Sequence, residues 1–470
     1  MPRKFKIVVS DLHLSAGRIS EGNVLEDFDR DLEFAGLLDE IAAESERDGS
    51  DVELILNGDA FEMLQVPHVD LFDPAEAYLP EQYHSSSEDD SVRKIAIIID
   101  GHPTFFSALS EFMQAGSPRR TVTFVKGNHD LNLHWTGVQD RIRKAVGAMG
   151  RRRSLLRFEE RRISREGIYV EHGNQYAEVV DRVSDMEEPH DHEKPGQLAL
   201  PLGSWFVMDV FNRMEREKYW IDGIKPITAL VWYALAFDFR FAASAIATLL
   251  RALPDVLRQG LLELQEPRAV AFAQQLENPE RVEMLAERYG TDLTFRTQFN
   301  QEVVGMLVPP PALTESVAPA LSSVSDPVAL GDQVQQRVRS SLFEMAAQRA
   351  EEEGVRLVIF GHTHDAGVEP LPNGGVYINS GTWTWRADFG QEGKETWRDL
   401  FEHPERFTQD RLLSFVRIDY DEEGQPSGRL AAYELTEKPM PEPKPALVEL
   451  WDRIVEWFRD LGDALLGNND

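Results

Sequence analysis

The sequence predicts an α/β protein whose strands carry polar side chains to one edge of a sheet. Short apolar runs at residues 4–9, 52–57, 121–125, 168–171 and 355–360 have the composition of buried strands. Each run continues directly into a polar block, in chain order SDLH, GDAFE, KGNHD, HGN and GHTH. Open α/β sheets bind their ligands beyond the carboxyl ends of the strands, so the five blocks mark a candidate site.

The stretches between these strands have the spacing of crossover helices. Apolar residues recur at helical intervals in residues 31–46, 92–115 and 138–149. Near the end of this pattern, residues 412–419 and 429–435 predict a hairpin around EEGQPSG.

A long segment that predicts only helices interrupts the alternating pattern. The chain has 470 residues, more than one ordinary core usually holds, so a large domain with insertions or two domains are expected. Residues 177–339 lack the strand pattern and contain helical segments broken by prolines. We therefore expect a core in two parts, residues 1–176 and 340–436, with a helical insertion between them.

The C-terminal segment, residues 437–470, predicts a Pro-rich linker followed by an amphipathic helix. Its apolar residues between 447 and 465 fall on one face of a helix. This helix is expected to dock on its own domain, to associate with a second copy or to bind a partner. The acidic polar face argues against a membrane role.

Composition narrows the chemistry and the partners. The chain has no cysteine, so any metal must be held by His, Asp, Glu or Asn. The formal net charge of −32 disfavours nucleic acid as a partner, because it repels a phosphate backbone. The N-terminus lacks a secretory signal pattern, and the longest apolar run, residues 226–237, is too short to span a membrane. We expect a cytoplasmic protein that acts on a small phosphorylated or nucleotide-linked substrate.

The polar blocks supply the residue types of a two-metal hydrolase. Two divalent cations about 3.5–4 Å apart polarise both the attacking and the leaving oxygen of an in-line displacement. A carboxylate between the cations offsets their repulsion, and Asp59 is the candidate because it ends a strand and follows Gly58, which permits a close turn. His, carboxylate and Asn ligands favour Mn²⁺, with Fe or Zn as alternatives.

The ordered motifs DxH, GDxxE, GNHD, HG and GHxH resemble those of the calcineurin-like metallophosphoesterases, over roughly residues 5–175 and 355–385. The resemblance implies a four-layer α/β sandwich that hydrolyses a phosphate ester or anhydride with a metal-bridging hydroxide. It implies that one metal is held by Asp11, His13, Asp59 and His364. It implies that the other metal is held by Asp59, Asn128, His172 and His362.

The same resemblance implies roles for two further residues. His129 would protonate the leaving oxygen or stabilise the charge on the phosphoryl group. Glu62 stands three residues after Asp59, where family members often have Asp, and would orient His129.

The substrate stays open among a phosphomonoester, a phosphodiester and a nucleotide pyrophosphate. The protein Ser/Thr phosphatases carry an Arg and GNHE where this chain has Met63 and Asp130. The UDP-2,3-diacylglucosamine pyrophosphohydrolases share the DLHL start, the GDxFE block and a helical insertion, but typically have GNRD and HGD where this chain has GNHD and HGN. Alternatives are a nuclease of the repair type and a non-catalytic scaffold that retains the metal site.

Other conspicuous residues have no motif context. The arginines at 151–153 are either a phosphate-binding group or a solvated basic face, and residues 70–90 are either a lid or a surface loop. We assign no ligand role to seven histidines, of which His134 lies nearest to a motif: His68, His84, His102, His134, His190, His192 and His403.

Overall fold

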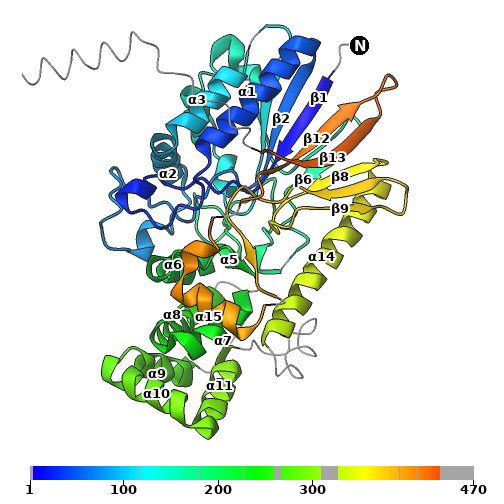
Figure 1. Ribbon diagram of the computed structural model, residues 1–470. Helices are drawn as coiled ribbons and strands as arrows, with labels where there is room; N and C mark the ends of the chain where they lie inside the picture. Colours follow the sequence, from blue (N-terminus) through cyan, green and yellow to red (C-terminus); the bar gives the residue numbers. More distant parts are fainter. Residues whose placement is uncertain are drawn as a thin grey trace, which may run out of the picture. The chain divides into compact units, whose positions relative to one another are not determined.

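The computed structural model describes residues 4–434, apart from residues 115, 178, 226, 259–265, 308–326, 391 and 410. This part of the chain is a mixed α/β structure with two main mixed sheets (Figure 1), so the predicted α/β class is confirmed. None of the described helices combines the length and the apolar character needed to cross a membrane. The predicted linker and helix at residues 437–470 lie outside the described residues.

The first sheet has six strands in the order β13-β12-β1-β2-β3-β4, and its strands β1 to β4 are parallel. β12 pairs antiparallel with β1, and β13 closes the predicted hairpin. The strands are β1 (Lys4–Val9), β2 (Asp51–Asn57), β3 (Arg120–Val125), β4 (Leu156–Glu159), β12 (Ser414–Tyr420) and β13 (Pro426–Ala432).

The second sheet has five strands in the order β5-β6-β8-β10-β9, with β6, β8 and β10 parallel. Its strands are β5 (Arg162–Arg165), β6 (Ile168–Glu171), β8 (Leu357–Phe360), β9 (Gly367–Pro370) and β10 (Val376–Asn379). All five strands predicted ahead of the polar blocks are therefore present. The strands of this sheet that the sequence did not predict are β5, β9 and β10. Each is only four residues long, too short for a clear periodicity.

Alternating side chains of the strands build separate cores on the two faces of each sheet. Ile7 and Leu54 face a cluster that includes Phe34 and Phe105 from the helices, whereas Val8 joins a cluster between the two sheets. The helices on the first sheet are α1 (Asp31–Asp48), α2 (Glu88–Gly101), α3 (Pro103–Phe112) and α4 (Thr136–Ala145).

The outer face of the second sheet is covered by the long helix α14 (Pro327–Glu352), through contacts such as Leu342 and Ala346 with Val358. The layers therefore follow in the order helices, first sheet, second sheet and α14 (Figure 1). The predicted boundary between residues 339 and 340 falls inside α14.

The segment after residue 177 contains mostly helices, which share a core of their own. Trp385 and Trp397 from the later part of the chain belong to this core, and β7 (Ile224–Lys225) pairs with β11 (Ala387–Asp388). The helices are α5 (Leu202–Phe206), α6 (Asn212–Glu217), α7 (Ile227–Phe237), α8 (Phe239–Arg258), α9 (Glu266–Leu276), α10 (Pro279–Thr291), α11 (Leu293–Leu307) and α15 (Lys394–Glu402).

The predicted helical stretch at residues 92–115 is two helices, and the break lies at His102 and Pro103. Proline has no backbone N–H and cannot continue α2, but it suits the first turn of α3. The buried His102 places Nε2 at 3.1 Å from Glu26 Oε2 and Nδ1 at 3.1 Å from Asp31 Oδ2. Burial by itself lowers the pKa of His102, but Glu26 and Asp31 outweigh it and raise the pKa to about 9.

This pairing predicts a pH-dependent contribution to stability. His102 is cationic in the folded state, so its contribution is complete below the unfolded-state pKa of 6.5 and is lost as the pH rises through about 9. In urea titrations, the stability difference between the wild type and His102→Gln should shrink by up to about 3 kcal/mol over that range. A difference that stays constant with pH would show that folding does not raise the pKa of His102.

Candidate metal centre

Side chains from four strand ends meet in two adjoining groups. The donors come from the loops that succeed β1, β2, β6 and β8, which lie in two different sheets. In each group the ligand atoms lie within 4.8 Å of one another. The first group contains Asp11, His13 and His364, and the second contains Asp59, His172 and His362.

Asp11 connects the two groups. Its Oδ1 lies 3.4 Å from Nε2 of His364 and 4.0 Å from Nε2 of both His13 and His172. Within the first group, the Nε2 atoms of His13 and His364 are 3.0 Å apart. Within the second group, Asp59 Oδ2 lies 2.9 Å from His172 Nε2. The carboxylate of Asp59, which the sequence predicted to lie between the two metals, also accepts from the backbone N of His129 at 2.9 Å.

The backbone at this site is strained. Five of the seven non-glycine residues with positive φ in the described part are predicted ligands, with φ between 49° and 69°: Asp11, His13, Asp59, His362 and His364. Such conformations are unfavourable for L residues and concentrate at functional sites. Glycines permit the close packing, because a Cβ on Gly127 would lie 2.0 Å from Asp59 Oδ1 and one on Gly361 would lie 2.5 Å from Asp11 Oδ2.

Hydrogen bonds orient two of the imidazoles. Nδ1 of His172 lies 3.0 Å from the carbonyl oxygen of Asn57, which can only accept, so Nδ1 carries the hydrogen. Nδ1 of His13 lies 2.8 Å from Glu62 Oε2, which also accepts, so this Nδ1 carries the hydrogen as well. Each ring therefore presents Nε2 to its group, the arrangement usual for metal-bound histidines.

The buried charges at the centre shift the pKa values strongly. Burial raises the pKa of Asp59, but His172 and His129 outweigh it and hold the pKa well below its usual value. Burial opposes a charge on His172, yet Asp59 and Asp11 raise its pKa to about 9. Burial and the neighbouring His172 lower the pKa of His362 to about 3, so its imidazole is neutral. The carboxylates thus favour positive charge on the neighbouring imidazoles. A metal cation bound to the imidazole nitrogens can supply that charge in place of a proton.

Asn128, a predicted ligand, has a buried side-chain oxygen, Oδ1, without a hydrogen-bond partner among the described residues. Leaving such an oxygen unsatisfied costs about 1–3 kcal/mol, which coordination to a cation would offset. Two carboxylates, imidazole nitrogens and an amide oxygen fit divalent cations of the manganese, iron or zinc type.

Glu62 holds His129 beside the centre. Its Oε2 lies 2.5 Å from His129 Nδ1, while the same oxygen contacts His13. Burial raises the pKa of Glu62, but His129 outweighs it and the pKa falls to about 2. Burial lowers the pKa of His129, but Glu62 and Asp59 raise it to about 10. The contact predicted between Glu62 and His129 is present, and it leaves Nε2 as the free nitrogen of a cationic ring.

The sequence did not predict two carboxylates that support the site. Asp130 accepts from Gly127 N at 2.7 Å and from Ala60 N at 2.9 Å, and so ties the turn after β3 to the turn after β2. The D of GNHD could have suggested this role. Asp181 Oδ2 lies 3.6 Å from His362 Nε2, and no local motif marks that residue.

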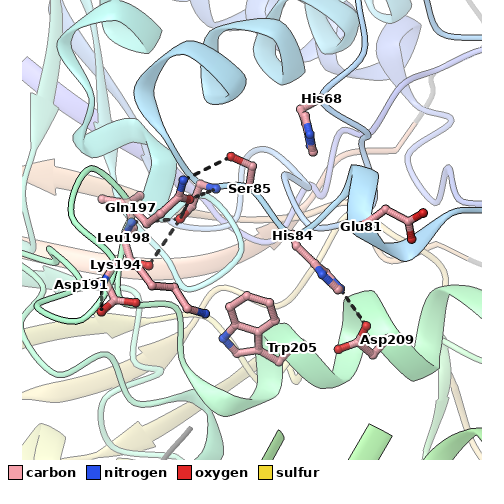
Figure 2. A pocket seen from close by; sticks show the side chains of 11 residues that line it. His68, Glu81, His84, Ser85, Asp191, Lys194, Gln197, Leu198, Trp205 and Asp209 are labelled. Atoms are coloured by element: carbon pink, nitrogen blue, oxygen red, sulfur yellow. Dashed lines mark hydrogen bonds and ion pairs between the residues drawn. The ribbon is translucent and has the colours of Figure 1, made fainter. Parts of the chain in front are cut away.

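A cavity of about 730 Å³ lies between the loop before α2, the loop at residues 191–198 and the helical segment that begins at α5 (Figure 2). Trp205, His84 and Lys194 line it, with His84 Nε2 at 2.7 Å from Asp209 Oδ1. Part of the segment at residues 70–90, predicted as a lid or a surface loop, therefore forms a cavity wall.

Three carboxylates form another group: Asp27, Glu215 and Asp222. Glu215 is buried, accepts from Gln65 Nε2 at 2.5 Å and has no partner for Oε1 among the described residues. Burial and the neighbouring Asp27 raise its pKa well above the usual value.

Glu215→Gln is expected to stabilise the protein by about 1–3 kcal/mol near pH 8, because the amide needs no proton. A raised carboxyl pKa means that stability falls as the pH rises above the unfolded-state value, so the gain should disappear towards pH values of about 4. Thermal melts across this range test the effect, with Glu217→Gln on the same helix as the control. A loss of stability in Glu215→Gln at both pH values would contradict the argument.

No protein-family model and no curated protein matches the sequence. The functional assignment therefore depends on the residues and their geometry.

Proposed function

We propose that the protein is a two-metal phosphoesterase of the calcineurin-like type. The observation that carries this proposal is the convergence of the motif residues, which are spread over more than 350 positions of the chain, into two adjoining groups of ligand atoms. The layered order of helices, sheet, sheet and helix supports the four-layer sandwich that the motifs imply.

The contacts between the residues indicate which of them would hold each cation. Asp11, His13 and His364 would hold one cation, and Asp59, His172 and His362 the other, with the unpartnered Asn128 Oδ1 as a further donor. When bound, the cations supply positive charge for the attacking and leaving oxygens of an in-line displacement at phosphorus. Manganese is the proposed metal, with iron or zinc as alternatives.

His129 is the proposed acid. Glu62 fixes the ring through Nδ1 and keeps it protonated, so Nε2–H can donate to a phosphoryl oxygen or to the leaving oxygen. Its side chain is 21% exposed, against 0% for His172, so His129 can reach a substrate. Asp130 ties the turn after β2 to the turn after β3 and so holds the backbone near Glu62 and His129.

The test is a comparison of three substrates in the presence of Mn²⁺: a nitrophenyl phosphomonoester, a bis-nitrophenyl phosphodiester and a UDP-linked pyrophosphate. We expect turnover of at least one of them, lost in Asp59→Asn and retained in Asp70→Asn, whose carboxylate is exposed. The preferred substrate identifies the esterase class. Absence of turnover together with a metal content near zero per chain would overturn the proposal and favour a non-catalytic scaffold.

A further inference from the structure

A separate group of ligand atoms lies outside the centre described above. It contains His134, Glu188 and His190, whose ligand atoms lie within 4.8 Å of one another. Neither histidine has a motif context in the sequence, so no ligand role was predicted for it. The two are 56 positions apart. His134 ends the 3₁₀ turn Leu131–His134, which comes directly after the GNHD block.

The spacing of these atoms matches one metal ion. Two imidazole nitrogens bound to a tetrahedral zinc at about 2.0–2.1 Å are about 3.3–3.4 Å apart. The Nε2 atoms of His134 and His190 are 3.3 Å apart, and Glu188 Oε2 lies 3.6 Å from His190 Nε2. A hydrogen bond between the imidazoles and an ion pair of Glu188 with His190 account for the two distances separately, whereas one cation accounts for both.

The surroundings of His134 suit a neutral ligand. Burial and the nearby Lys126 lower its pKa, so Nε2 or Nδ1 has a free lone pair at neutral pH. Lys126 Nζ lies 3.4 Å from His134 Nδ1, but it is paired with Glu160 at 2.5 Å. Glu160 Oε2 also lies 3.5 Å from Nδ1, where it can accept the ring hydrogen and leave Nε2 for a metal.

The loop that carries the other two residues is held in place before any ion binds. Asp185 Oδ1 accepts from the backbone N of Glu187 and Glu188 at 2.8 and 3.1 Å. His190 pairs with Leu198 in an isolated bridge, and its ring lies 5.5 Å from that of Trp135. Little ordering is therefore needed for binding, which favours affinity.

We propose that His134, His190 and Glu188 form a separate binding site for one divalent ion of the zinc class, with solvent in the remaining positions. Two imidazoles and one carboxylate with open positions are a zinc-type donor set. An ion here would connect the segment around Glu188 to the turn just after His129. This site does not depend on the proposed phosphoesterase activity.

The experiment measures zinc bound per chain to the full-length protein after chelation and dialysis against buffered free Zn²⁺. It uses the Asp59→Asn background as well as the wild type, so that zinc in the centre at Asp59 is distinguished from zinc bound by His134, Glu188 and His190. His190→Ala and Glu188→Gln each remove one ligand. Both side chains are exposed, so we expect neither substitution to unfold the protein. His192→Ala, exposed on the same loop, is the matched control.

We expect His190→Ala to weaken the binding of one zinc equivalent by at least about 100-fold in both backgrounds, because loss of even an outer hydrogen bond to a ligand costs about 10–100-fold. Glu188→Gln should weaken the same equivalent, and His192→Ala should change nothing. Equal zinc binding by His190→Ala and the wild type would overturn the proposal and leave a simple hydrogen bond between the imidazoles.

Discussion

Asp59→Asn is expected to reduce turnover by about 10³-fold or more and to lower the metal content of the purified protein. The carboxylate lies 2.9 Å from His172 and carries negative charge at the centre of the site. Asparagine keeps the shape but removes the charge that offsets a cation. Loss of about 4 kcal/mol of transition-state stabilisation corresponds to about 10³-fold in rate.

Three measurements separate this effect from misfolding. Turnover in Mn²⁺, metal per chain and thermal unfolding are determined for the wild type, Asp59→Asn and Asp70→Asn. The control carboxylate is 94% exposed and is expected to change none of them. Full turnover in Asp59→Asn would remove the basis of the two-metal mechanism.

His129→Ala is expected to reduce turnover by about 10²–10⁴-fold while the metal content stays at the wild-type level. The ring contacts Glu62 at 2.5 Å and is not one of the predicted ligands, although its ligand atom lies within 4.8 Å of those of His13 and Glu62. An acid that protonates the leaving oxygen matters most when that oxygen leaves poorly. The loss should therefore be larger for an alkyl phosphate ester than for a nitrophenyl ester.

The leaving-group comparison also distinguishes the two proposed roles of His129. Equal losses on both esters would indicate stabilisation of phosphoryl charge rather than proton donation. His403→Ala is the matched control, because this exposed ring lies at the surface, 3.6 Å from the nearby Glu405. Metal loss in His129→Ala would contradict its role as an acid and would indicate that it holds a metal together with His13 and Glu62.

The strands and the motif residues could be predicted because their signals are local. A run such as residues 4–9 is apolar over consecutive positions, and Asp11 and His13 come directly after it. Parallel strands end at one edge of a sheet, so the sequence order of strand and polar block was enough to bring predicted ligands together. The helix break at His102 was missed because helical periodicity continues on both sides of Pro103.

The remaining features depend on contacts between distant segments. Asp11 connects the two groups at up to 4.0 Å, and His134 meets His190 across a long connection. Trp397 joins a helical core formed mostly by residues more than 90 positions earlier. Periodicity indicates which face of an element is apolar, and spacing indicates which polar residues lie just beyond its end. Which distant side chains then meet is decided by the packing of whole elements, so these partners became visible only in the tertiary structure.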